Sequence, residues 1–173
     1  AKREPRNVLV YQRFDAPLGP MVAIASEKGL CLLEFGDRRM LESEFADLQK
    51  RLSAVLLPGK NEFTEEAVRQ IQEYFAGTRK TFSVPLHAPG TEFQQQVWAA
   101  LREIPFGEMR SYGEIASAIG EPKAVRAVGT ANGMNRIAIM IPCHRVIGAD
   151  GALTGYGGGL WRKDWLLKHE QEY

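Results

Sequence analysis

Apolar and polar residues along the first half of the chain follow patterns that predict a small sheet with helices. Three stretches rich in strand-forming residues are separated by glycine and proline turn signals; they are residues 7–14, 20–26 and 29–35. Apolar residues at helical spacing predict helices over residues 40–54 and 64–77, with Thr64 as the N-cap of the second and Gly77 just past its end. Residues 81–86 suit one more strand. The pattern therefore predicts an α/β domain built on a small antiparallel sheet.

The second half of the chain has mostly helical patterns. An amphipathic helix is expected over residues 91–104, because Pro105 and Gly107 end the pattern. The segment HAPGTEF interrupts the patterns and marks the boundary between two expected domains. Residues 1–88 would form an N-terminal α/β domain that gives structural support, and residues 89–173 would form a mostly α domain.

Two short helices in the second half have the spacing of a helix-turn-helix. The first is expected to start after Ser111 and to stop at Gly120. Pro122 suits the first turn of the next helix, which would continue to about Gly133. Many helical hairpins share this spacing without touching DNA. The predicted architecture of this half is therefore a helical, winged-helix-like domain, and its binding to DNA needs further support.

The second of these helices is dominated by small residues, namely Ala124, Ala127, Gly129, Thr130, Ala131 and Gly133. Small side chains let a helix approach the minor groove closely, and they equally let it pack tightly against another helix. Its long polar side chains are those of Lys123, Arg126 and Asn132, whereas a helix that reads bases in the major groove usually displays several more. These residues alone leave both interpretations open.

Composition narrows the class of protein. Hydrophobic residues make up 45% and charged residues 25% of the chain, as in soluble globular proteins, and no apolar run has the length of a membrane span. With 2 cysteines and no apolar signal region, a reducing, cytoplasmic setting is expected. The net charge is only +1, but residues 122–149 contain basic side chains and no acidic one, which fits a local contact with a polyanion. The basic residues there are Lys123, Arg126, Arg136 and Arg145.

The stretch IAIMIPCHRVIG, residues 137–148, places a thiol beside a base and a fixed positive charge. Such neighbours make a thiol a good nucleophile, whereas a buried thiol without them is inert. Adjacent side chains of an extended chain point to opposite faces, so contact between Cys143 and His144 would need a turn or a bridging water. A histidine base also needs a carboxylate to orient it, and position leaves Asp164 and Glu170 as alternatives. The spacing favours a reactive Cys143.

Two segments carry a resemblance to a known family, IPCHRVIGADGALTGYGGGLWRKDWLLKHE and FQQQVWAALREIPFGEMRSYGEIASAIGEPKAVRAVGTANGMN. With its specific P-C-H-R-V core, the chain resembles the O6-alkylguanine-DNA alkyltransferases, also called methylated-DNA–protein-cysteine methyltransferases. The resemblance covers residues 89–170, while the N-terminal half matches in general plan only. Without an N-terminal cysteine cluster, the chain looks like the stand-alone repair form rather than the adaptive-response regulator.

The resemblance implies roles for the residues of the site. Cys143 would accept the alkyl group, His144 would remove the thiol proton through a water, and Glu170 would orient His144. Tyr112 would protonate a ring nitrogen of the departing guanine, and Asn135 would hold the turn that leads to Cys143. Because no side chain could hydrolyse the thioether product, the resemblance implies one turnover per molecule and no cofactor.

The resemblance also implies the partner. It would be double-stranded DNA bearing O6-alkylguanine, and also O4-alkylthymine, bound through the minor groove with little sequence specificity by a monomeric protein. Arg126 would enter the base stack as the damaged nucleotide leaves it, since a thiol cannot reach its target atom inside a paired duplex. The other expected DNA-binding residues are Lys123, Ala127, Thr130, Ala131 and Tyr112. The expected pocket residues are Pro142, Val146, Tyr156, Gly157 and Gly158.

The chain departs from many relatives in places. Arg136 follows Asn135 where many relatives have proline. Some relatives bind a structural zinc in the N-terminal domain, but only Cys31 and His87 fall near such positions here. Because two ligands do not make a tetrahedral site, we predict no zinc and interpret Cys31 as a core residue of a strand.

Three rival hypotheses use parts of the same sequence. A thiol hydrolase would use Cys143, His144 and a carboxylate with turnover, but it leaves the helix-turn-helix unexplained. A DNA-binding module without chemistry conflicts with the intact P-C-H-R motif. A structural protein with a buried cysteine would make Tyr112, Arg126 and Asn135 accidental. The alkyltransferase hypothesis accounts for all of these features.

Overall fold

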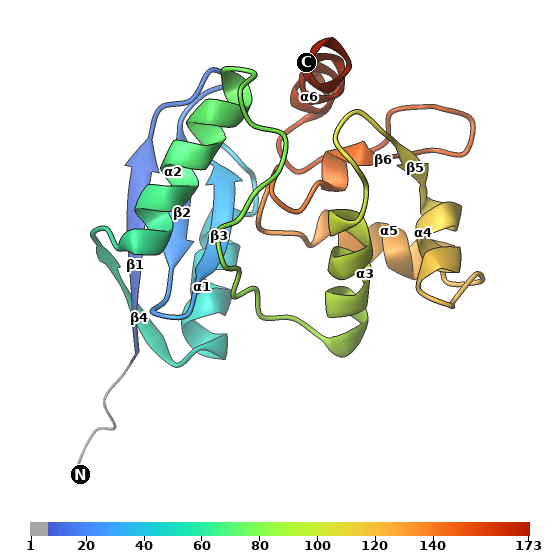
Figure 1. Ribbon diagram of the computed structural model, residues 1–173. Helices are drawn as coiled ribbons and strands as arrows, with labels where there is room; N and C mark the ends of the chain where they lie inside the picture. The colour runs from blue at the N-terminus through green and yellow to red at the C-terminus, as the bar shows by residue number, and fades with distance from the viewer. Residues whose placement is uncertain (1–6) are drawn as a thin grey trace. The chain divides into compact units, whose positions relative to one another are not determined.

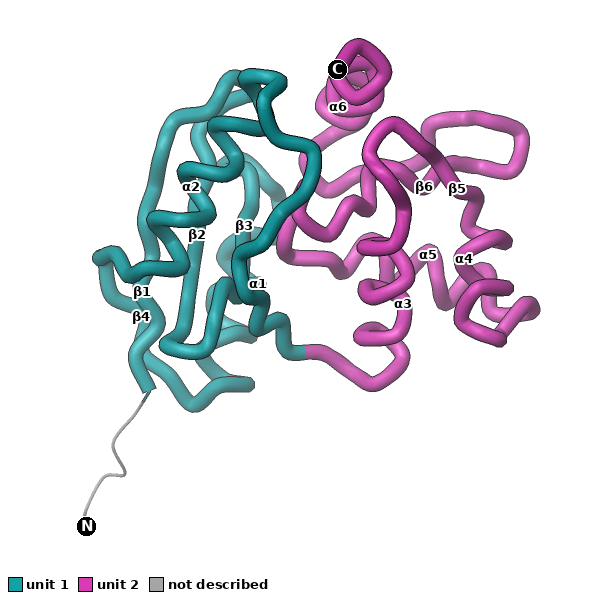
Figure 2. The backbone as a smooth tube through the Cα atoms, in the orientation of Figure 1, with its two compact units in different colours: residues 1–89 teal, residues 90–173 magenta. Residues whose placement is uncertain are grey.

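A computed structural model describes residues 7–173 of the protein. The chain divides into two compact units, residues 1–89 and residues 90–173, as Figure 2 shows in two colours. The division falls in the same proline- and glycine-containing segment in which the sequence patterns change.

The first unit contains a four-stranded sheet with strand order β3-β2-β1-β4. The strands are β1 (Asn7–Phe14), β2 (Met21–Ala25), β3 (Leu30–Phe35) and β4 (Ala54–Pro58). β1, β2 and β3 pair in antiparallel fashion, but β4 pairs with β1 in parallel, so the sheet is mixed rather than purely antiparallel. β4 was not predicted because the expected helix ran through residue 54, whereas the pairing that defines this short strand comes from distant β1.

Two helices cover opposite faces of this sheet, with α2 in front of the strands and α1 behind them in Figure 1. α1 spans Leu41–Arg51 and α2 spans Glu62–Phe75. Every residue of β2 and β3 is buried, as expected for strands covered on both faces. Cys31 belongs to the core cluster between the sheet and α1, as predicted.

Two local predictions in this unit are wrong. The N-cap of α2 is Asn61 and not Thr64, because the Asn61 side chain accepts hydrogen bonds from the backbone N–H groups of Phe63 and Thr64. Thr64 completes a capping box from the third position of the helix. The segment 81–86 forms only an isolated parallel bridge between Leu86 and Leu30 instead of a strand.

The second unit gathers three helices, α3 (Glu92–Arg102), α4 (Tyr112–Ala118) and α5 (Val125–Gly133). Ser111 caps α4 through a capping box, and Gly120, with φ of 79°, follows its end. These ends agree with the predicted first helix of the helix-turn-helix. α5 begins later than predicted, because Pro122 lies in a separate turn closed by a 2.9 Å hydrogen bond from Ala124 N–H to the Glu121 carbonyl.

The remaining elements of the second unit bring distant segments together. A short 3₁₀ helix at Cys143–Arg145 precedes β6 (Val146–Ile147), which pairs in parallel with β5 (Arg110–Ser111). The last helix, α6 (Leu160–Glu172), contacts the 3₁₀ helix. Among helices of residues 7–173, none combines the length and apolar composition that crossing a bilayer requires.

Candidate active site and DNA-binding surface

The segment that leads to Cys143 is a buried series of turns held by one asparagine. The Asn135 side chain donates to the carbonyls of Ile137 at 3.3 Å and Ile141 at 2.8 Å, and it accepts from Ile137 N–H at 3.0 Å. Ile139 has φ of 71°, a left-handed conformation that is unfavourable for a β-branched residue. Side-chain bonds from Asn135 therefore hold this turn in a chain that has Arg136 instead of proline at the next position.

Cys143, His144 and Arg145 form the single 3₁₀ turn that follows. The backbone here is not extended, so the argument that the side chains of Cys143 and His144 point to opposite faces does not apply to this segment. Cys143 is only 7% exposed, and His144 is fully buried. The thiol and the imidazole are thus both placed in the interior of the second unit.

A buried network binds His144 to α6. His144 Nε2 lies 2.7 Å from Glu170 Oε2, while Arg145 donates to Glu170 Oε1 at 2.7 Å and to Oε2 at 3.0 Å. Arg145 also donates to the carbonyl of Ile104 at 2.7 Å. The alternative carboxylate, Asp164, instead pairs with Lys168 on the exposed face of α6. The geometry therefore selects Glu170 as the partner of His144.

The charges in this network favour a neutral histidine and an ionised glutamate. Burial opposes ionisation of Glu170, but its bonds to His144 and Arg145 hold the pKa of the carboxyl well below its usual range. Burial lowers the pKa of His144, and the nearby Glu170 carboxylate only partly offsets that effect. The Nε2 proton of a neutral His144 then points to Glu170. Its Nδ1 has no hydrogen-bond partner among the described residues, so its lone pair is available to accept a proton.

Lys163 is a residue of the site that sequence reasoning missed. It is fully buried, and its Nζ donates to the carbonyls of Val146 at 2.6 Å and Thr154 at 3.0 Å. Burial lowers the pKa of Lys163, and a thiolate at Cys143 would act in the opposite direction. The signal was the helical spacing of Lys163, Leu166 and Glu170, which places the three on one face of α6.

The two tryptophans of α6 do not form the core of its buried face. Trp161 is 58% exposed, and Trp165 is half-buried. The buried face instead includes charged and polar side chains, and its residues are Arg162, Lys163, Leu166, Leu167, His169 and Glu170. This face is polar because α6 carries part of the site.

Pairing of β5 with β6 brings Tyr112 to the same region. Arg110 pairs with Val146 and Ser111 with Ile147, and Tyr112 follows directly as the first residue of α4. The Tyr112 hydroxyl lies 2.5 Å from the Thr154 side-chain hydroxyl. The hydrogen bond between Tyr112 and Thr154 therefore links the start of the helix-turn-helix to the loop that follows Cys143.

The predicted pocket residues lie on both sides of this loop. Pro142 and Val146 are buried and flank the 3₁₀ helix. Tyr156, Gly157 and Gly158 lie just before α6, where Gly159 N–H donates to the Tyr156 carbonyl at 2.9 Å. The Gly158 carbonyl accepts from the Arg162 guanidinium at 3.0 Å. Tyr156 is half-buried and Gly157 exposed, so this turn is the accessible part of the predicted set.

The two faces of α5 explain its small residues in two ways. Val128, Ala131 and Asn132 are buried, and the Trp98 indole donates to the Ala131 carbonyl at 2.9 Å. Ala131 is only 3% exposed, so it lies on the buried side of α5 and not on its exposed face. The opposite face is exposed and carries Arg126, Ala127 and Thr130. Packing and surface contact thus use different sides of the same helix.

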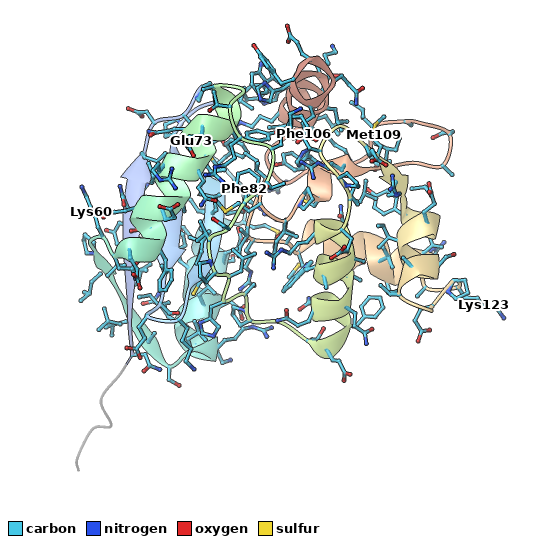
Figure 3. The ribbon with its side chains drawn as sticks, in the orientation of Figure 1. Lys60, Glu73, Phe82, Phe106, Met109 and Lys123 are labelled. Atoms are coloured by element: carbon cyan, nitrogen blue, oxygen red, sulfur yellow. The ribbon has the colours of Figure 1, made fainter. Side chains whose placement is uncertain are left out.

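The basic residues predicted to meet a polyanion also divide. Lys123 projects toward solvent from the turn between α4 and α5 in Figure 3, and Arg126 is exposed on α5. Arg145, in contrast, is buried in its pair with Glu170 and cannot face DNA. The acid-free stretch therefore supplies two exposed cations at the helix-turn-helix, while the charge of Arg145 is paired in the interior.

The residues considered for zinc are held by hydrogen bonds. His87 Nδ1 lies 2.8 Å from the Ser26 hydroxyl and 3.9 Å from the Cys31 sulfur. Within residues 7–173, no group of three or more histidine, cysteine, aspartate or glutamate side chains is arranged to hold a metal ion.

The fold and the site define a class of protein, one in which a buried cysteine, histidine and glutamate lie in the same unit as a helix-turn-helix. Comparison with known families agrees. Residues 9–88 match the ribonuclease-like domain of 6-O-methylguanine DNA methyltransferase, and residues 92–172 match the DNA binding domain of the same family. The chain belongs to the 6-O-methylguanine DNA methyltransferase family.

Individual relatives match along nearly the whole chain. A methylated-DNA–protein-cysteine methyltransferase of Methanosarcina acetivorans is 48% identical over 166 residues, which cover 94% of this chain and 98% of that one. The crystal structure of Mycobacterium tuberculosis O6-methylguanine methyltransferase is 46% identical, with a TM-score of 0.82 over 95% of this chain and 93% of that chain. A crystal structure of M. tuberculosis OGT in complex with DNA has a TM-score of 0.81 at 46% identity, over 94% of this chain and 93% of that one.

Proposed function

We propose that the protein repairs duplex DNA by transferring the alkyl group of O6-alkylguanine to the sulfur of Cys143. The observation that carries the proposal is the buried array of Cys143, His144 and Glu170 in the unit that also holds the helix-turn-helix. Membership of the family supplies the reaction class, and this array supplies the atoms that would perform it.

Proton transfer from the thiol would begin the reaction. His144 Nδ1 takes the Cys143 proton through a water, and Glu170 holds the imidazole in the required tautomer. The buried ammonium of Lys163 favours the resulting thiolate. The thiolate sulfur then bonds to the alkyl carbon while the bond from that carbon to O6 breaks. Tyr112 donates a proton to the ring nitrogen of the departing guanine.

The thioether formed at Cys143 explains why each protein molecule would react only once. A thioether has no leaving group that a neighbouring histidine or carboxylate could displace, so the alkylated Cys143 remains alkylated. The protein would therefore act once, without a cofactor. O4-alkylthymine offers the same alkyl–oxygen bond and would be a second substrate.

DNA would be bound through the minor groove by the exposed face of α5. Arg126 would fill the gap in the base stack after the damaged nucleotide rotates out, while Lys123 contacts phosphate and Ala127 and Thr130 line the close approach. Contacts of this kind carry little sequence information. The protein would bind as a monomer inside the cell, with residues 1–88 as structural support and residues 89–173 as the reactive part.

The pocket for the extruded base would be formed by Pro142, Val146 and the turn at Tyr156–Gly158. Backbone groups of that turn are positioned by its own hydrogen bond and by Arg162, so they could read the guanine edge without side-chain movement. Tyr112 would close the pocket from the side of α4.

Intact-protein mass spectrometry tests the proposal directly. The protein is incubated with duplex containing O6-methylguanine, and Cys143→Ala is the matched control. We expect a stoichiometric gain of one CH₂ unit that maps to Cys143 and is absent from the control. Retained binding of damaged duplex without this gain would favour a damage sensor, and neither binding nor gain would refute the assignment of substrate.

A further inference from the structure

Thr154 lies between the tyrosine and the buried lysine of the site, and the roles above leave it unassigned. Its side-chain hydroxyl lies 2.5 Å from the Tyr112 hydroxyl, and its backbone carbonyl accepts from Lys163 Nζ at 3.0 Å. Lys163 also donates to the carbonyl of Val146, the residue that follows the 3₁₀ helix of Cys143. The lysine therefore fixes the position of Thr154 relative to the cysteine segment.

Both partners of the Tyr112–Thr154 hydrogen bond are anchored independently of that bond. The loop before Thr154 is closed by a 2.9 Å hydrogen bond from Gly148 N–H to the Ala152 carbonyl. Tyr112 packs along α5, where a Cβ added to Gly129 would lie 3.8 Å from the Tyr112 ring. The hydroxyl pair thus joins two fixed segments rather than two loose side chains.

We propose that Thr154 is a positioning residue that holds the Tyr112 hydroxyl for proton donation to the departing guanine. The proposal rests on the function proposed above for Tyr112. A threonine hydroxyl both donates and accepts hydrogen bonds. Tyr112 can donate to Thr154 while the site is empty of base, and Thr154 can donate to the Tyr112 oxygen once that O–H turns toward the guanine. The hydrogen bond persists while its direction reverses.

The reversal places the Thr154 donor where charge develops. As the sulfur–carbon bond forms and the carbon–O6 bond breaks, the electron pair of the broken bond passes into the guanine ring. The Tyr112 proton moves to the ring nitrogen, and the tyrosine oxygen carries negative charge until solvent returns a proton. Hydrogen bonds to charged oxygens are stronger than those to neutral ones. Thr154 should therefore affect the rate of transfer more than the affinity for DNA.

Single-turnover transfer from saturating O6-methylguanine duplex tests this role in Thr154→Val, Thr154→Ser, Tyr112→Phe and the double variant Tyr112→Phe/Thr154→Val. Thr154→Val removes the hydroxyl and keeps the branched shape, so transfer should slow by about tenfold to a hundredfold, as for one hydrogen bond to a charged group. Thr154→Ser should restore the rate. In the Tyr112→Phe background the valine substitution should have no further effect.

The outcomes separate this proposal from the one on which it rests. The positioning role would be overturned if Thr154→Val transferred the methyl group at the wild-type rate. It would also be overturned if the valine substitution slowed transfer by the same factor in the wild type and in Tyr112→Phe. Either result would leave Tyr112 as the donor. Wild-type transfer by Tyr112→Phe would instead overturn the donor role itself. Melting temperature and affinity for the damaged duplex check each variant, and if Thr154→Val does not fold, Thr154→Ala is expected to show the same slowing.

Discussion

Each unit of the protein buries an arginine beside carboxylates, but the charges are balanced differently. In the first unit, Arg38 lies 2.5 Å from Glu34 and 3.4 Å from Glu44, so two carboxyl groups share one cation. In the second unit, Arg145 and His144 both bind the single carboxylate of Glu170. In the first cluster two carboxyl groups lie beside Arg38, whereas in the second a cation and a neutral donor lie beside one carboxylate.

This difference decides which carboxyl group is ionised. Burial raises the pKa of Glu34 well above its ordinary value of 4.5; Arg38 opposes that rise, and Glu44 adds to it. Burial of Glu170 acts in the same direction, yet its bonds to His144 and Arg145 lower its pKa overall. Burial alone therefore does not set the charge of a buried carboxyl group. The charges and donors around the carboxyl group also contribute, and the proposed role of Glu170 requires its ionised form.

Among the substitutions in the two clusters, replacement of Glu170 should have the largest effect on stability and on methyl transfer. Glu170→Gln leaves Arg145 buried without its anionic partner, so the free energy of unfolding should fall by about 3–5 kcal/mol in urea titrations. Methyl transfer should slow by at least about a hundredfold, since His144 loses its orienting carboxylate. Unchanged stability with the same loss of transfer would show that the pair serves chemistry alone.

Lys163→Met should have the next largest effect. The substitution removes two buried hydrogen bonds to the carbonyls of Val146 and Thr154, so unfolding free energy should fall by about 1–3 kcal/mol, with slower methyl transfer. Lys168→Met on the exposed face of the same helix is the matched control and should change stability by less than about 0.5 kcal/mol. Equal effects of the two substitutions would contradict a special role for the buried lysine.

The stability of Glu34→Gln relative to the wild type should depend on pH, and this dependence distinguishes Glu34 from Glu170. Above pH 4.5 the unfolded chain loses the Glu34 proton first while the folded protein keeps it, so this group makes stability fall as pH rises toward the folded pKa. Glutamine mimics the protonated carboxyl, so the variant should change stability by less than about 1 kcal/mol near pH 4.5. It should gain relative to the wild type as pH rises. Glu170 has the opposite sign, because its contribution is present above pH 4.5 and is lost in more acidic solution.

The smallest expected effect is a displaced acid limb in the rate profile. Because burial lowers the pKa of His144 below its ordinary value of 6.5, the base stays neutral in mildly acidic solution. The midpoint at which the single-turnover rate falls on the acid side should therefore lie below pH 6.5. A midpoint above 6.5 would mean that Glu170 outweighs burial and holds His144 in the charged form.

Sequence patterns were most informative where a structure depends on neighbouring residues. The Ser111 cap and Gly120 end predicted α4, because caps and left-handed glycines act within one turn of a helix. The same reasoning misplaced the N-cap of α2, since Thr64 does bond to the start of the helix but from its third position. Local signals thus predicted the helix α2 but misplaced its start by a few residues.

Sequence patterns were least informative where partners lie far apart along the chain. β4 exists through its pairing with β1, and Ala131 faces the interior because Trp98 of α3 packs there. The resemblance implied that Glu170 orients His144, but position alone left Asp164 as an alternative. Nothing local distinguished two acids on one helix, because the difference is which face of α6 meets the 3₁₀ helix.

The sequence by itself determined the helix pattern of the second half, the histidine and arginine beside Cys143 and, through the P-C-H-R-V core, the family. Such features are encoded in residues a few positions apart, whose interactions survive without the rest of the fold. Only the tertiary structure decided that Arg145 pairs inside rather than facing DNA, and that Lys163 joins Val146 to Thr154. Buried charges require compensating partners, and those partners come from whichever elements the fold packs against them.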